Sequence, residues 1–223
     1  MNKTVLVVAA HADDEALGCG GTIAKHAAEG DHVHVVFVAD GVTSRNGAEP
    51  TDLLQRQQAT ESARCILGIS SVTFLNLPDN RLDGLPLLDV VQPLEALIGN
   101  LAPAIVYTHH YGDLNVDHRI VHKAVMTACR PMPGSTIREI FAFEVMSSTE
   151  WASPGLAPFL PNFFVDISAQ LESKMQALEA YMLEMRTSPH SRSLEHMRCL
   201  AEHRGFCVGS AAAEAFMVMR VLR

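Results

Sequence analysis

The chain has 223 residues, of which 48% are hydrophobic and 19% charged, a composition typical of a folded globular protein and unlike a disordered or fibrous one. The length favours a single mixed domain over residues 1–223. Seventeen Lys and Arg against 25 Asp and Glu leave a net charge of −8, which disfavours binding to nucleic acid or to anionic membranes.

Apolar runs rich in β-branched residues alternate with segments of helical length along the first 130 residues. The pattern predicts strands at residues 4–10, 33–39, 72–77 and 104–108, and helices at residues 16–29, 53–67, 87–101 and 118–129. Strands and helices that alternate in this way imply βαβ units. We therefore predict an α/β fold with a mostly parallel sheet and helices on both faces.

The rest of the chain, from residue 131 onwards, has a different pattern. It predicts strands at residues 140–145 and 163–167 and helices at residues 171–185 and 194–203, while residues 215–221 suit a strand or a helix. No linker rich in Gly or Ser separates this tail from the rest. We therefore expect the tail to complete the same domain.

The apolar segments and cysteines also bear on location. Residues 5–10 form too short an apolar run for a signal peptide and are soon followed by acidic residues. No segment approaches the ~20 apolar residues of a membrane span. The five cysteines are scattered without a C-x-x-C pair, so neither a disulfide framework nor a zinc knuckle is indicated. A cytoplasmic protein is expected.

Two segments dense in His and acidic residues follow predicted strands. The first is H-A-D-D-E (residues 11–15) and the second is H-H-Y-G-D-L-N-V-D-H (residues 109–118). The first segment alone also suits an exposed turn whose acids stabilise a helix start, and His118 alone also suits an ordinary residue at a helix start. Ligands in an open parallel sheet bind beyond the C-terminal strand ends, however, and mixed His and carboxylate ligands suit zinc. Together the two segments predict a metal site.

Three glycines after the first predicted strand raise the alternative of a dinucleotide site. Gly18, Gly20 and Gly21 do not form the G-x-G-x-x-G pattern. The three carboxylates that precede them would repel a pyrophosphate. We therefore expect these glycines to allow close packing of a helix.

The same residues carry a family resemblance. Residues 7–41, with A-H-A-D-D-E, L-G-C-G-G-T and a strand that ends in A-D-G, resemble the PIG-L/LmbE-like metal-dependent N-deacetylases. The similarity continues through G-D-L-N-V-D-H-R (112–119), H-S-R-S (190–193) and A-E-A-F (213–216). It implies a Rossmann-like three-layer α/β fold, one divalent ion, usually Zn²⁺, and hydrolysis of an N-acyl group on an amino sugar or a related amide.

The resemblance also implies roles for individual residues. His11, Asp14 and His118 correspond to the metal ligands, and Asp13 corresponds to the general base. Such a site has two imidazoles, one carboxylate and an open position for water. Asp117 fits a carboxylate that orients an imidazole.

Two positions depart from the family pattern. Ala12 replaces a proline, which removes no ligand. Asn115 stands where many members have an assisting histidine, and an amide is neither cationic nor acidic at neutral pH. The missing role falls to His110 or Tyr111, or Asp13 performs both proton transfers.

Substrate contacts are expected from loop residues. We predict that Arg45, Asp79 and Asn115 contact the substrate, although Arg45 and Asp79 also suit solvated loops. Arg192, with His190, suits the binding of an anionic group, and a surface salt bridge is the alternative.

The sequence thus predicts a zinc-dependent N-deacetylase. Its expected substrate is a small-molecule N-acetylated amino sugar or a nucleotide-linked or lipid-linked conjugate. A metal-dependent hydratase and a non-catalytic zinc-binding module are the alternatives. A homo-oligomer is compatible with the sequence, which identifies no interface.

Overall fold

The structure is a computed structural model that describes residues 2–44, 47 and 50–223. Arg45, predicted to contact the substrate, lies outside the described residues. The strands are β1 (Thr4–Ala9), β2 (His32–Ala39), β3 (Ser71–Leu77), β4 (Ile105–His109), β5 (Glu139–Phe143), β6 (Phe163–Asp166) and β7 (Ala213–Val221). The helices are α1 (Asp14–Ala28), α2 (Pro50–Leu67), α3 (Leu87–Leu101), α4 (Val116–Ala128), α5 (Leu171–Ala180) and α6 (Leu194–Phe206), with short 3₁₀ turns at Leu82–Gly84 and Thr149–Trp151.

The described strands form one mixed sheet in the order β3-β2-β1-β4-β5-β7-β6. Strands β1 to β5 pair in parallel, whereas β7 runs antiparallel to both β5 and β6. The predicted α/β fold with a mostly parallel sheet is confirmed. The segment that suited a strand or a helix is the strand β7, because its position between β5 and β6 supplies partners on both edges.

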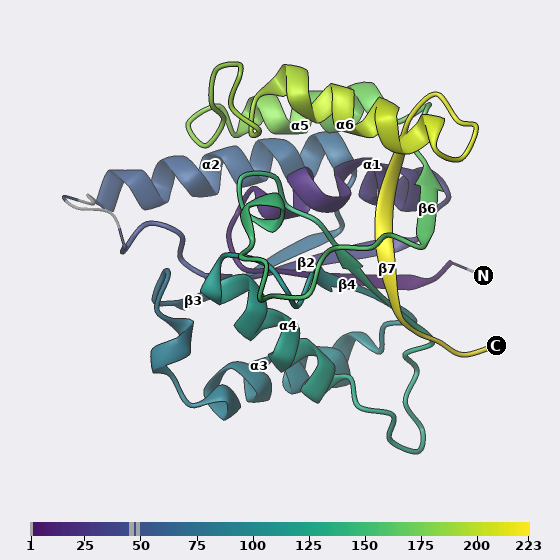
Figure 1. The fold of residues 1–223 in the computed structure, drawn as a ribbon. Helices are drawn as coiled ribbons and strands as arrows, with labels where there is room; N and C mark the ends of the chain where they lie inside the picture. The colour runs from purple at the N-terminus through teal and green to yellow at the C-terminus, as the bar shows by residue number, and fades with distance from the viewer. Residues whose placement is uncertain (1, 45–46, 48–49) are drawn as a thin grey trace.

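Helices cover both faces of the sheet, as Figure 1 shows, with α1, α2, α5 and α6 on one side and α3 and α4 on the other. The position of β1 between two cores explains why its sequence is apolar throughout. Val5 and Val7 belong to the core that packs under α1, whereas Leu6 and Val8 belong to the opposite core under α3 and α4. A strand buried on both faces has no polar side.

Strand order reverses between β1 and β4, which are neighbours in the sheet although α1, β2, α2, β3 and α3 lie between them in sequence. The chain leaves β1 for α1 on one face and leaves β4 for α4 on the other. The two connections therefore diverge and leave a crevice beyond the C-terminal strand ends, which is where such sheets bind ligands.

Helix α1 breaks at Cys19, whose φ of −147° and ψ of 24° are not helical. The carboxylate of Glu214 on β7 accepts the N–H groups of Gly21 (3.0 Å) and Thr22 (2.7 Å), which the break leaves without helical partners. Lys174 donates to Glu214 and, at 2.8 Å, to the carbonyl oxygen of Leu17. The A-E-A-F segment thus supports the helix that begins at the crevice.

The ends of two predicted elements differ from the structure. Helix α5 stops at Ala180, five residues before the expected end, and the chain then turns so that Tyr181 is buried. Strand β5 stops at Phe143 rather than at residue 145. Among the described residues, no helix is both long and apolar enough to cross a lipid bilayer.

Candidate active site

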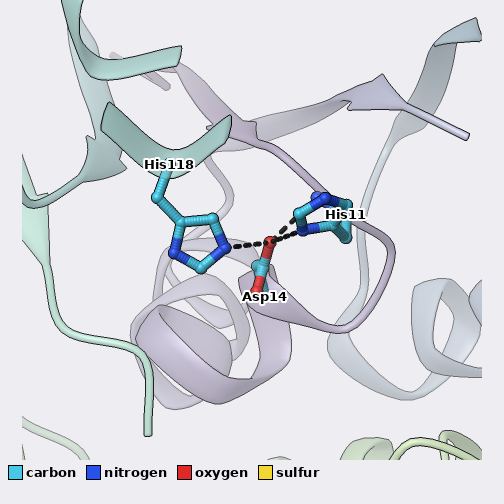
Figure 2. Close-up of side chains that lie close together, drawn as sticks. All are labelled: His11, Asp14 and His118. Atoms are coloured by element: carbon cyan, nitrogen blue, oxygen red, sulfur yellow. Dashed lines mark hydrogen bonds and ion pairs between the residues drawn. The ribbon is translucent and has the colours of Figure 1, made fainter. Parts of the chain in front are cut away.

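Three side chains converge beyond the C-terminal ends of β1 and β4. His11 follows β1, Asp14 begins α1, and His118 lies in the first turn of α4. Oδ2 of Asp14 lies 3.3 Å from Nδ1 of His11 and 3.3 Å from Nε2 of His118. Figure 2 shows both imidazoles beside this one carboxylate. The potential ligand atoms lie within 4.8 Å of one another, so the structure brings together the three predicted metal ligands.

Each imidazole is contacted on its other nitrogen by a further carboxylate. Nδ1 of His118 lies 3.1 Å from Oδ1 of Asp113. Nε2 of His11 lies 3.0 Å from Oδ1 of Asp79 and 3.2 Å from Oδ2 of Asp117. Histidines that ligate metals commonly donate their second N–H to a carboxylate, which fixes their tautomer and orientation. The donor set therefore fits a divalent ion such as zinc.

Buried negative charge surrounds both imidazoles. Burial by itself lowers the pKa of His118, but Asp14 and Asp113 outweigh it and raise the pKa to about 9. Burial also opposes the charged form of His11, yet its bonds to carboxylates, with Asp117 foremost, raise its pKa well above the usual value. The site therefore attracts positive charge, which either protons or a divalent cation supply.

Asp13 precedes α1, and its carboxylate faces two arginines. Oδ2 accepts a hydrogen bond from Nη1 of Arg192 at 2.9 Å. Oδ1 is buried and has no hydrogen-bond partner among the described residues, and Nη2 of Arg56 lies 3.6 Å from it. Burial raises the pKa of Asp13, as does the charge of Asp14, while Arg192 and Arg56 act against the rise. These are properties suited to a general base.

These groups line a cavity of about 160 Å³ whose lining side chains are polar apart from Gly41. Among its lining residues are seven predicted from the sequence, namely His11, Asp13, Asp14, Asp79, Asn115, His118 and Arg192. Residues from four separate parts of the chain therefore share one cavity, although nothing in their spacing placed Arg192 beside Asp13.

Asn115 and Asp117 occupy supporting positions at the start of α4. Oδ1 of Asn115 caps the helix by accepting the N–H of Asp117 at 2.8 Å, while Nδ2 donates to Oδ1 of Asn80 at 3.3 Å. The carboxylate of Asp117, besides its contact to His11, accepts main-chain N–H groups of Asn80 at 2.7 Å and Leu82 at 3.1 Å. Asp117 is thus placed to orient the His11 imidazole.

His110 does not fit the role of proton donor that the sequence suggested for it. Its side chain is fully buried, its Nε2 lies 2.8 Å from the carbonyl oxygen of Ala157, and it is absent from the cavity lining. A side chain without access to the cavity cannot protonate a leaving group there. We therefore correct this expectation and leave His110 out of the proposed chemistry.

The preceding residue, His109, is the histidine of this pair that reaches the site. Its ring stacks on that of His118 with centroids 3.9 Å apart, and its Nε2 accepts the N–H of Ala10 at 2.8 Å. Burial lowers the pKa of His109 well below its usual value. A neutral ring thus supports His118 from one side. The two adjacent histidines indicated the site, but the sequence did not show which of the two rings faces His118.

Arg56 lines the cavity and was missed by sequence reasoning. It is buried and donates from Nη2 to the carbonyl oxygen of Ala12 at 3.0 Å, and from Nη1 to that of Gly41. Gly41 has a φ of +71°, and a Cβ there would lie 2.7 Å from the guanidinium carbon. The polar sequence around Arg56 in α2 resembles a solvent-exposed face, so periodicity offered no sign of burial.

His190 and Arg192 come from the segment before α6. Nδ1 of His190 accepts the N–H of Arg192 at 3.0 Å, and its ring packs edge-on against Trp151. The Arg192 guanidinium contacts Asp13 and, through Nε, the carbonyl oxygen of Met146 at 3.3 Å. The expected binding of an anion by Arg192 stays a prediction, since its nearest partner is already a carboxylate.

Comparison with known proteins finds one family whose profile, PIG-L (GlcNAc-PI de-N-acetylase), matches residues 6–129. An uncharacterised deacetylase of Escherichia coli K12, YaiS, is 31% identical over 185 residues, covering 80% of this chain and 90% of that protein. A 1D-myo-inositol 2-acetamido-2-deoxy-α-D-glucopyranoside deacetylase of Saccharomonospora viridis is 28% identical, covering 97% and 95%. The solved 4-carboxy-2-hydroxymuconate hydratase GalB of Pseudomonas putida KT2440 shares the fold, with a TM-score of 0.79, 24% identity and coverage of 99% and 98%.

Proposed function

This chain belongs to the PIG-L (GlcNAc-PI de-N-acetylase) family, and we propose that it is a zinc-dependent deacetylase that removes the N-acetyl group from an amino-sugar conjugate. The observation that carries the proposal is the pairing of the His11, Asp14 and His118 group with Asp13 in one polar cavity. Relatives named as deacetylases of sugar conjugates support the substrate class.

We propose His11, Asp14 and His118 as the residues that hold the ion. When bound, a zinc ion supplies a Lewis acid that polarises a carbonyl group and increases the acidity of water. Asp113 and Asp117 orient the two imidazoles through their second nitrogens.

Asp13 acts as the base in this scheme. Its Oδ1, without a hydrogen-bond partner among the described residues, accepts a proton from the attacking water. Because Asn115 replaces the usual histidine and His110 is buried elsewhere, the same carboxylate returns the proton to the departing amine. Arg192 holds Oδ2, so that one oxygen is fixed while the other reacts.

The space beside the cavity lined by Asp13 favours a sugar conjugate over a free sugar as the substrate. A second cavity of about 540 Å³ adjoins the first and shares the walls formed by Arg56 and Glu184. Its lining includes the neutral polar side chains of Gln55, Gln58 and Ser62 on α2. We infer that the reacting acetamido sugar enters the smaller cavity and that the rest of the conjugate lies in the larger one.

The hydratase alternative is supported only by a shared fold, because the hydratase neighbour is 24% identical.

We also propose a cytoplasmic location. The five free cysteines support a reducing compartment such as the cytoplasm.

Product analysis with a panel of substrates tests the proposal. Free N-acetylglucosamine, an N-acetylated disaccharide, and phosphorylated and nucleotide-linked N-acetyl sugars are incubated with the protein, and acetate and free amine are both measured. We expect equal amounts of the two products, loss of turnover on chelation, and recovery with Zn²⁺. Stoichiometric zinc without acetate release from any substrate would favour a non-catalytic module. Water addition to an activated double bond without amide cleavage would favour a hydratase.

A further inference from the structure

One member of the acidic cluster takes no part in the chemistry proposed above. Glu15 directly follows Asp14, is fully buried, and does not line the cavity. Its Oε1 accepts the hydroxyl of Tyr181 at 2.8 Å, and its Oε2 accepts the main-chain N–H of Asp13 at 3.1 Å. Glu15 therefore contacts the proposed base through the main chain of that residue.

The main chain of Asp13 has a conformation that residues other than glycine seldom adopt, with φ 145° and ψ −26°. Asp13 is the N-cap of α1, a position where an aspartate side chain normally accepts an N–H of the first turn. It makes no such hydrogen bond. Its carboxylate instead faces Arg192 and the cavity. The unusual backbone thus directs the carboxylate away from the helix that it would ordinarily cap.

The contact from Glu15 resembles one half of a capping box, with the acidic residue two positions after the N-cap residue instead of three. In the full motif, the N-cap side chain bonds to an N–H of the first turn while an acidic side chain bonds back to the N–H of the N-cap residue. Here the return contact from Glu15 is present and the contact from Asp13 is missing. Tyr181, which is 1% exposed, holds Glu15 from the end of α5.

We propose that Glu15 is a positioning residue for Asp13. By binding the main-chain N–H of Asp13, Glu15 keeps that carboxylate directed into the cavity and off the N-terminus of α1. The proposal rests on the proposed function, because it takes Asp13 as the base.

A double-mutant cycle tests the proposal. Glu15→Ala is expected to keep its zinc and its KM and to lose about 10²-fold in kcat, the scale of a misplacement of ~1 Å. Glu15→Gln is expected to recover most of kcat, because the amide oxygen can accept the same N–H. In the Asp13→Asn protein, Glu15→Ala is expected to cause no further loss, since Glu15 acts through Asp13. An equal loss in both backgrounds would overturn the proposal.

Glu214→Gln is the matched control. Glu214 is also a buried carboxylate that accepts N–H groups of α1, but it does so at the break in the helix. This variant is expected to lose stability and keep kcat in the folded fraction, so a loss of kcat equal to that of Glu15→Ala would point to general loosening of α1 and overturn the proposal. If Glu15→Ala does not fold, Tyr181→Phe removes only the supporting hydroxyl and should lower kcat less, again with no effect in Asp13→Asn.

A crystal structure of Glu15→Ala or of Tyr181→Phe supplies a readout that does not depend on activity. We expect Asp13 to return to a negative φ and its carboxylate to cap α1. An unchanged Asp13 would contradict the positioning role. Full activity of Asp13→Asn, by contrast, would show that the proposed base is wrong, and the crystal structure would still judge the part played by Glu15.

Discussion

At the scale of single residues, a substitution of His118 offers the most direct test of the proposed metal site. Its Nε2 faces Asp14 and its Nδ1 faces Asp113. His118→Ala is expected to remove both zinc and activity, because a site with three protein ligands cannot spare one. The measurement is elemental analysis beside the acetate assay.

His26→Ala is the control for the metal-site experiment. His26 lies near the far end of α1, where it contacts Asp31 and Tyr107. This variant should keep zinc and activity. Full zinc occupancy in His118→Ala would show that the ligand assignment is wrong.

A substitution of Arg192 distinguishes two roles for this residue, namely holding Asp13 and binding an anionic group of the substrate. Because its guanidinium contacts the Asp13 carboxylate, Arg192→Ala is expected to lower kcat about tenfold, or ~1.4 kcal/mol of barrier, on free and phosphorylated substrates alike. Steady-state kinetics on both substrates supplies the measurement. Arg198→Ala, which removes an ion pair with Glu172 outside the cavity, should change neither constant. A rise in KM confined to the phosphorylated substrate would instead support the anion-binding role predicted from the sequence.

At the scale of elements, the glycines of α1 show how closely this helix packs. A Cβ on Gly21 would lie 2.6 Å from Cδ1 and 2.9 Å from Cβ of Ile167, whereas a Cβ on Gly20 would meet Lys174 at an ordinary 3.5 Å. Gly21→Ala is therefore expected to lower the free energy of unfolding by about 1–3 kcal/mol through overpacking. Gly20→Ala, one residue away, should be tolerated. Urea denaturation of the two variants measures the difference, and equal stabilities would contradict the packing argument.

The same packing accounts for the glycine-rich segment that suggested a dinucleotide site. A Cβ on Gly18 would clash with the ring of Phe143, and one on Gly21 with Ile167. Gly18 and Gly21 therefore let α1 approach the sheet and the tail, as expected, whereas Gly20 has space for a Cβ. Two of the carboxylates ahead of them, Asp13 and Asp14, line the polar cavity.

At the scale of the whole molecule, burial divides the five cysteines into two classes. Cys65, Cys199 and Cys207 are exposed, whereas Cys19 and Cys129 are buried. Burial raises the pKa of Cys129 to about 12 and that of Cys19 well above its usual value. Because the thiolate is the reactive form, an alkylating reagent at pH 8 should modify the three exposed thiols in the native protein and all five in urea. Peptide mass spectrometry identifies the modified residues, and native labelling of Cys19 or Cys129 would contradict the packing of the core.

Local sequence determined most of the elements and the centre of the site. Burial of β1 on both faces favours apolar residues along the strand, so the apolar run at residues 4–10 predicted a strand. His11, Asp13 and Asp14 follow that strand within four residues, and their place at its C-terminal end depends only on chain connectivity. His118 was predicted from the segment rich in His and acidic residues that follows the strand at residues 104–108 and from the family resemblance. Element ends were less certain, since an amphipathic pattern continues past Ala180 although α5 stops there.

Tertiary structure alone decided which distant groups meet these residues. Arg192 reaches Asp13 across 179 positions and Arg56 reaches Ala12 across 44, and no local pattern encodes such contacts. Adjacent residues on a strand point to opposite faces, so sequence could not say whether His109 or His110 would meet His118 until β4 had paired with its neighbours. The sequence by itself therefore determined the fold class, and it predicted that His11, Asp14 and His118 would meet beyond the strand ends. The packing of α2 and of the segment before α6 placed Arg56 and Arg192 around Asp13, because side-chain partners in a cavity depend on how separate elements pack together.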